Sequence, residues 1–152
     1  MIGDGFQKID LVIREITCGI LIMGLVSIVN AYTFSWIMLS YRKALSISSQ
    51  RSEHFEIMRF VFYTLRLVVS MILSLSVWVF ALTYFHFVDD WLDALLYATS
   101  FFTSVGNFNV PMPYGWRMIP SIIAFSGLFS FAWATAATIG MANDLTKHLG
   151  RK

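Results

Sequence analysis

The chain has 152 residues, of which 57% are hydrophobic and 13% are charged, and its formal net charge is +2. A soluble domain carries roughly twice that share of charged residues, and the apolar residues here form long charge-free runs, so the sequence predicts an all-α integral membrane protein. The basic residues flank these runs rather than form a patch, so no nucleic-acid partner is expected. The one cysteine, Cys18, cannot form an intrachain disulfide.

Residues 1–56 are predicted to hold an amphipathic N-terminal segment, an extra transmembrane helix and a cytoplasmic connector. Met1 to Glu15 mixes apolar and charged residues, which is typical of one or two helical turns at the membrane surface. Ile16 to Tyr41 carries no charge and is long enough to span a bilayer. Within it, Asn30 either makes an interhelical hydrogen bond or lies on an ion path. The basic residues after Tyr41 indicate that the connector is cytoplasmic.

Ile57 to Val88 is predicted to form one long helix, whose charge-free part begins at Leu67. Arg59 and Arg66 are seven residues apart, so both lie on one face near the cytoplasmic end and reach the lipid headgroups. Acidic residues follow this helix. On a helix, His86, Asp89, Asp90 and Asp93 would share a face, but no second His or Cys completes a transition-metal set. The three aspartates are therefore interpreted as an acidic rim that concentrates cations at an outer vestibule.

The stretch from Trp91 to Tyr114 has the pattern of a re-entrant loop. Its first half can form about three helical turns, too few to cross a bilayer core that takes roughly 20 helical residues. Its second half contains Gly106, two Asn and two Pro, which break helices. Irregular backbone at membrane depth survives only where it is buried in protein or lines a water-filled path. This stretch is therefore the candidate for a pore.

Met118 to Asn143 is predicted to be the last span, followed by a short cytoplasmic tail, residues 144–152. Two stripes of small residues run along this span at four-residue spacing. One begins at Ser126 and the other at Ala132. One stripe should pack against a neighbouring helix and the other should face a water path, and the spacing alone does not decide between them.

Four short segments carry a family likeness: Asp93-Ala-Leu-Leu-Tyr97, Thr103-Ser-Val-Gly106, Gly115-Trp-Arg117 and Gly127-Leu-Phe129. Together they resemble the pore module of tetrameric, prokaryotic-type potassium channels with two membrane helices per subunit. The resemblance covers roughly Leu67 to Asn143. It implies a pore module over residues 57–143, with an outer helix, a pore helix, a filter loop and an inner helix, and a homotetramer around a central pore in the inner (plasma) membrane. Gly127 in the inner helix is either a gating hinge or a site of close helix packing. The extra N-terminal span lies outside the resemblance.

The likeness in the selectivity filter is only partial. Thr103, Ser104, Val105 and Gly106 occupy the positions of the family's Thr-Thr-Val-Gly, so the inner rings of carbonyl oxygens are available. The outer positions differ, with Asn107, Phe108 and Asn109 where the family has Tyr, Gly and Asp. Phe108 cannot adopt a positive φ without strain. The outer half should therefore be wider, and the resemblance with its departures implies a monovalent-cation channel that discriminates weakly between K⁺ and Na⁺.

Other interpretations remain open at this stage. Thr-Ser-Val-Gly is also a plausible helix-ending turn in a non-conducting structural or regulatory subunit, and an altered outer filter is compatible with potassium selectivity. No nucleophile with a nearby base occurs within the spans, so no enzyme activity, catalytic residue or cofactor is expected. The expected partners are further copies of the chain, membrane lipid and the permeant cations.

Overall fold

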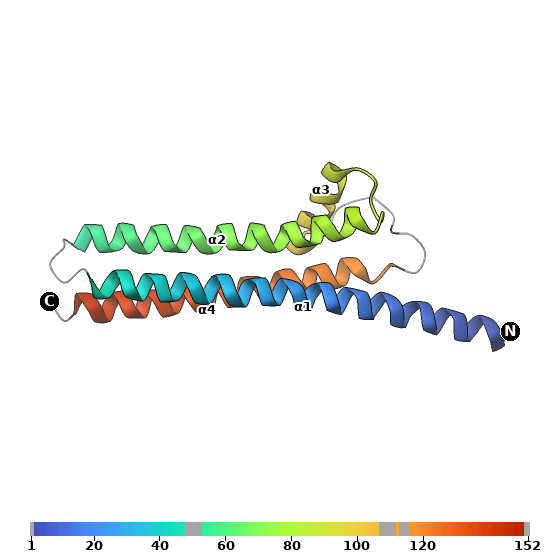
Figure 1. Ribbon diagram of the computed structural model, residues 1–152, viewed down its shortest axis with the longest axis horizontal. Helices are drawn as coiled ribbons and strands as arrows, with labels where there is room; N and C mark the ends of the chain where they lie inside the picture. The colour runs from blue at the N-terminus through green and yellow to red at the C-terminus, as the bar shows by residue number, and fades with distance from the viewer. Residues whose placement is uncertain (1, 48–52, 107–111, 113–115, 151–152) are drawn as a thin grey trace. The chain divides into compact units, whose positions relative to one another are not determined.

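The computed structural model describes residues 2–47, 53–106, 112 and 116–150, with side chains from residue 9 onward. Within these residues the chain forms helices α1 (Ile2–Ser46), α2 (Glu53–Tyr84), α3 (Trp91–Phe102) and α4 (Ile119–Leu149) (Figure 1). Of these, α1, α2 and α4 are long and apolar enough to cross a membrane. The all-helical class and the three candidate spans agree with the sequence expectation.

The helices divide into two compact units. Unit 1 comprises Met1–Ile28 with Ser74–Phe129, and unit 2 comprises Val29–Leu73 with Ser130–Lys152. Each of the three long helices therefore contributes one part to each unit, and α3 belongs to unit 1 alone. The predicted segments 1–56, 57–143 and 144–152 are continuous in sequence, whereas each of these units combines separate parts of the chain. The division into those three segments stays a prediction.

Unit 2 is built from parts of α1, α2 and α4 around an aromatic and aliphatic core. The buried α1 residues recur every three or four positions, so they form one stripe along the helix. Asn30, at the start of this stripe, donates through Nδ2 to Ser130 Oγ on α4 at 2.8 Å, which confirms the interhelical hydrogen bond. The buried hydrophobic core comprises Phe34, Ile37, Tyr41, Leu45, Leu67, Ala137 and Met141.

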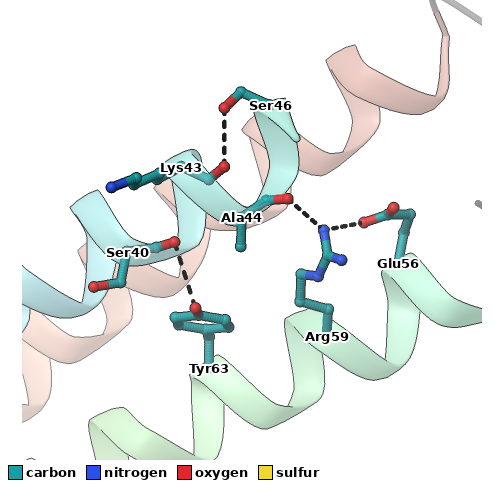
Figure 2. A network of polar contacts seen from close by, with 7 residues as sticks. All are labelled: Ser40, Lys43, Ala44, Ser46, Glu56, Arg59 and Tyr63. Atoms are coloured by element: carbon teal, nitrogen blue, oxygen red, sulfur yellow. Dashed lines mark hydrogen bonds and ion pairs between the residues drawn. The ribbon is translucent and has the colours of Figure 1, made fainter. Parts of the chain in front are cut away.

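The last turn of α1 is capped by side chains from α2, as Figure 2 shows. Arg59 donates through Nη1 to the carbonyl of Ala44 at 2.7 Å and pairs with Glu56 at 3.1 Å. Tyr63 donates to the carbonyl of Ser40 at 3.4 Å. The carbonyl of Ala44 lies in the last turn of α1, where carbonyls have no intrahelical partner, so Arg59 caps this helix end. Tyr63 adds a contact one turn earlier. Arg59 is thus committed to protein contacts rather than to lipid headgroups.

Unit 1 is held by two buried polar contacts between helices. Trp78 on α2 donates through Nε1 to Ser126 Oγ on α4 at 3.0 Å. Glu15 on α1 is 2% exposed, and its carboxylate accepts the backbone N–H groups of Met118 and Ile119 at the start of α4. N–H groups at the start of a helix have no acceptor within the helix, and Glu15 supplies one for both of these groups. The N–H of Ile119 also donates to the carbonyl of Trp116 at 3.4 Å.

Three expected boundaries differ from the structure. The helix α1 runs unbroken from Ile2, where only a turn or two was expected before the first span. The helix α2 ends at Tyr84 rather than at Val88, because the chain turns through His86, whose φ is 53°. The helix α4 continues to Leu149, so most of the predicted tail is helical. Charged residues are adequate helix formers and extend a helix that has already formed, so a change in polarity does not mark its end.

Candidate ion-conduction site

The helix α3 is too short to cross a membrane. Its 12 residues give a length of about 18 Å, against roughly 30 Å for a bilayer core. The helix begins after Asp90, which has an extended backbone and whose carboxylate accepts the N–H groups of Leu92 and Asp93 at 3.1 and 3.3 Å. An acidic N-cap of this kind both satisfies these donors and interacts favourably with the helix dipole.

Asp90→Ala should lower the free energy of unfolding by about 1 kcal/mol, because it removes the N-cap of α3. Thermal unfolding of the purified protein in detergent measures this change. Asp89→Ala is the matched control, since Asp89 is an equally exposed neighbour outside the cap, and its effect should stay within about 0.5 kcal/mol. Equal losses in the two variants would contradict the cap assignment.

One face of α3 is buried within unit 1, and the C-terminal end of this helix lies directly on α4. The buried residues are Ala94, Tyr97, Ala98 and Phe102. At Gly127 on α4, an added Cβ would lie 1.9 Å from the carbonyl oxygen of Phe102. Only a residue without a side chain fits between the two backbones at this point. Gly127 is therefore a site of close helix packing, and its predicted role as a gating hinge stays a prediction.

The chain leaves α3 through a complete helix cap. The N–H of Ser104 donates to the carbonyl of Phe101 at 2.9 Å, and the N–H of Val105 donates to that of Ser100 at 2.9 Å. These two bonds, with Ser104 at φ 61°, form a Schellman motif in which serine takes the position that glycine usually occupies. The N–H of Gly106, at φ 70°, bonds to the same Ser100 carbonyl at 3.1 Å.

This cap orients three consecutive carbonyl groups. In a planar trans peptide, a carbonyl points opposite to the N–H of the next residue. The N–H groups of residues 104–106 point back at the end of α3, so the carbonyls of Thr103, Ser104 and Val105 point away from it. Within the described part of the chain, none of these three carbonyls accepts a hydrogen bond. The same three carbonyls are those predicted from the sequence to form the inner rings of a filter.

The structure describes four of the seven predicted filter residues. Thr103, Ser104, Val105 and Gly106 are all exposed, and Val105 is 71% exposed. The Thr103 hydroxyl donates to the carbonyl of Thr99 at 2.8 Å, which orients its oxygen and leaves that oxygen free to accept or to coordinate. Asn107, Phe108 and Asn109 lie outside the described residues.

The acidic residues around the start of α3 do not gather into a metal centre. Asp89, Asp90 and Asp93 are exposed, and within the described ranges no three or more His, Cys, Asp or Glu side chains lie close enough to hold a metal ion. Asp90 acts as a helix cap, a role that its position directly before the first helical residue, Trp91, could have indicated.

Two structural residues of unit 1 were not identified from the sequence. Glu15 was assigned to an amphipathic surface segment, yet it caps α4, more than 100 positions away in the chain. Trp78 lies within the predicted helix from Ile57 to Val88, where no pattern singles it out, yet it is fully buried and donates to Ser126. A lone carboxylate at the edge of an apolar run was the available signal for Glu15, but no sequence rule connects it to a particular partner.

Comparison with known proteins adds no identification. No protein-family model matches the chain, and no curated protein or solved structure matches it at a significant level. The described residues therefore define the protein only as all-helical, with three candidate membrane-spanning helices and the short helix α3 between α2 and α4.

Proposed function

We propose that the protein is a cation channel whose narrow part is lined by the carbonyl oxygens of Thr103, Ser104 and Val105. The observation that carries the proposal is the orientation of these three carbonyls, away from α3 and without a hydrogen-bond donor in the described part of the chain. Unsatisfied backbone carbonyls are costly in lipid unless they face water or ions. A path for hydrated or partly dehydrated cations satisfies them.

The charge and position of α3 favour cations over anions. The C-terminal end of a helix carries a partial negative charge, and carbonyl oxygens coordinate cations. In this proposal α3 enters the membrane without crossing it, and its end lies at the conduction path. Asp89 and Asp93, both exposed at the other end of α3, attract cations to the mouth.

A single chain supplies only one wall of such a path. Residues 103–106 are exposed in the isolated chain, so a closed pore needs several copies around an axis, and the resemblance to potassium-channel pore modules favours a homotetramer. The substitutions at Asn107 and Phe108 remove the glycine-rich outer filter of that family. We infer weak discrimination between K⁺ and Na⁺, in a multi-pass protein whose C-terminus is cytoplasmic.

The test is the reversal potential of the purified protein in a planar bilayer with K⁺ on one side and Na⁺ on the other. A reversal potential near 0 mV, with a clear shift when the salt is diluted on one side, is the expected result for a weakly selective cation pore. A reversal potential near the K⁺ limit would support a potassium-selective channel with an altered outer filter. No current at high protein density would contradict the proposal.

Thr103→Ala should change the permeability ratio or the conductance, because it removes the hydroxyl at the inner end of the filter. Ser46→Ala is the control, since Ser46 lies at the end of α1 in unit 2 and its hydroxyl donates to the Lys43 carbonyl. The measurement is single-channel recording under the same gradient. If the two variants behave alike, the assignment of Thr103 to the conduction path is wrong.

A second candidate function is a non-conducting membrane subunit, and the complete helix cap favours it. The bonds from residues 104–106 to α3 are those of an ordinary helix end, and such an end needs no ion path if its carbonyls face water outside the membrane. Silence in the bilayer, together with labelling of Val105→Cys by a membrane-impermeant thiol reagent, would select this function.

A further inference from the structure

We propose that unit 2 carries a binding site for an anionic phospholipid, in which Arg66 binds the headgroup phosphate and a groove between α1 and α2 receives one acyl chain. This site is independent of the proposed conduction path, because it involves only residues 33–73 of unit 2 and none of α3. The occupant is identified by three features: a charge that no carboxylate of the described residues neutralises, an apolar groove beside it, and a position at the membrane boundary.

The charge of Arg66 is available to a ligand. Its guanidinium carbon lies 4.7 Å from the ring centroid of Trp36, 5.6 Å from that of Tyr63 and 5.7 Å from that of Phe62. These aromatic rings hold the guanidinium in place without neutralising it. Arg42 and Arg59, by contrast, pair with Asp144 and Glu56. Among the described residues no carboxylate pairs with Arg66.

A groove with a volume of about 220 Å³ extends from Arg66 between α1 and α2. Its apolar wall is formed by Trp36 and Ile37 on α1 and by Val69 and Leu73 on α2. The polar groups in it, the hydroxyls of Thr33 and Ser70, bond to each other at 2.5 Å. Because this pair is satisfied internally, the groove is effectively apolar and suits a hydrocarbon chain rather than a polar ligand.

The order of residues places the two parts of the site at the correct depths for a lipid. Arg66 is the last charged residue before the charge-free run that begins at Leu67, and that run is about as long as a bilayer core requires. Arg66 therefore lies at the headgroup level, beside Trp36 and Tyr63, residue types that favour this interface. Val69 and Leu73 follow toward the hydrocarbon region, where an acyl chain lies.

The test is native mass spectrometry of the full chain in detergent, titrated with phosphatidylglycerol or with phosphatidylcholine of the same acyl chains. We expect the wild-type protein to prefer phosphatidylglycerol, and Arg66→Gln to weaken its binding about tenfold, because a charge-assisted contact is lost. Arg42→Gln is the matched control: it removes an equal charge near the same end of unit 2 and should leave the lipid preference unchanged. Equal losses in the two variants would overturn the proposal, because binding would then follow net charge alone.

The groove is tested separately by Val69→Trp, which keeps Arg66 and fills the space beside it. This exposed position tolerates a larger side chain, so the variant should fold and lose most of its phosphatidylglycerol binding. Unchanged binding in Val69→Trp would show that no acyl chain enters the groove and would overturn the proposal. Soluble glycerol phosphate should not displace the lipid at equal concentration, and displacement by it would show that the site binds a free anion instead of a phospholipid.

Discussion

Gly127→Ala should destabilise unit 1 by about 3 kcal/mol, through overpacking of two backbones. The new Cβ would lie 1.9 Å from the carbonyl oxygen of Phe102 and 2.7 Å from its carbon. These are backbone atoms at the end of α3, so they cannot move without shifting the whole helix and the capped turn after it. Thermal unfolding in detergent should show a decrease in Tm of roughly 5 °C or more.

Gly24→Ala is the matched control for this substitution. Gly24 lies within α1, and an added Cβ there would meet nothing within 4 Å. Alanine favours helix over glycine by about 1 kcal/mol, so this variant should be as stable as the wild type or more stable. If Gly127→Ala unfolded at the wild-type temperature, the close contact with Phe102 would be excluded.

The same variant separates the two roles considered for Gly127. A hinge that only permits α4 to bend would alter channel opening and leave the unfolding temperature unchanged, since alanine is a good helix former. If Gly127 is instead a site of close packing, Gly127→Ala would lower the unfolding temperature. It would also displace the carbonyls of residues 103–105, so ion selectivity should change together with stability in the bilayer recordings.

Glu15→Ala should cost about 2 kcal/mol, because it removes a carboxylate that accepts two N–H groups at the start of α4, one of them on a buried residue. Those groups belong to Met118 and Ile119, and Ile119 is 0% exposed. Glu15→Gln should cost less, since the amide oxygen still accepts a hydrogen bond while the favourable interaction of the charge with the helix N-terminus is lost. Chemical or thermal denaturation in the same detergent gives the order wild type, Gln, Ala.

Glu53→Ala provides the comparison for Glu15. Glu53 is also acidic and lies in the first turn of α2, but it is exposed, so its loss should cost no more than about 1 kcal/mol. Similar effects at the two positions would mean that Glu15 acts only through its charge. That result would remove the direct contact between α1 and the start of α4.

Several features of the fold could be predicted from residue patterns. The charge-free runs predicted three spans, because a helix that crosses a bilayer needs about 20 apolar residues and a charge removed from water is costly. The short apolar stretch followed by Gly106 and Pro113 predicted a helix that ends before it could cross the membrane, and α3 ends at Phe102. Asn30 was predicted to bond across helices because an isolated amide in an apolar run needs a partner.

Other features depend on contacts between distant parts of the chain. The stripe that begins at Ser126 proved to be the packed one, with Trp78 bonded to Ser126 and Asn30 bonded to Ser130, whereas Ala132 and Ala136 are exposed. Four-residue spacing is identical in the two stripes, so it carries no information about which face meets a neighbour. The same limit applies to Arg59, whose capping of α1 depends on how two helices align.

The amino-acid sequence was sufficient to predict a membrane protein, the number of candidate spans and the place where a short helix ends. These features depend on local hydrophobicity and on local residues that break helices. The structure was needed to show that Ser104 closes a helix cap, that the carbonyls of residues 103–105 point away from α3, and that Gly127 lies against Phe102. The cap and the carbonyl direction arise within residues 100–106, but the residue types there fit both a helix-ending turn and a filter loop. The contact of Gly127 with Phe102 depends on the close approach of two helices, which no pattern within either helix encodes.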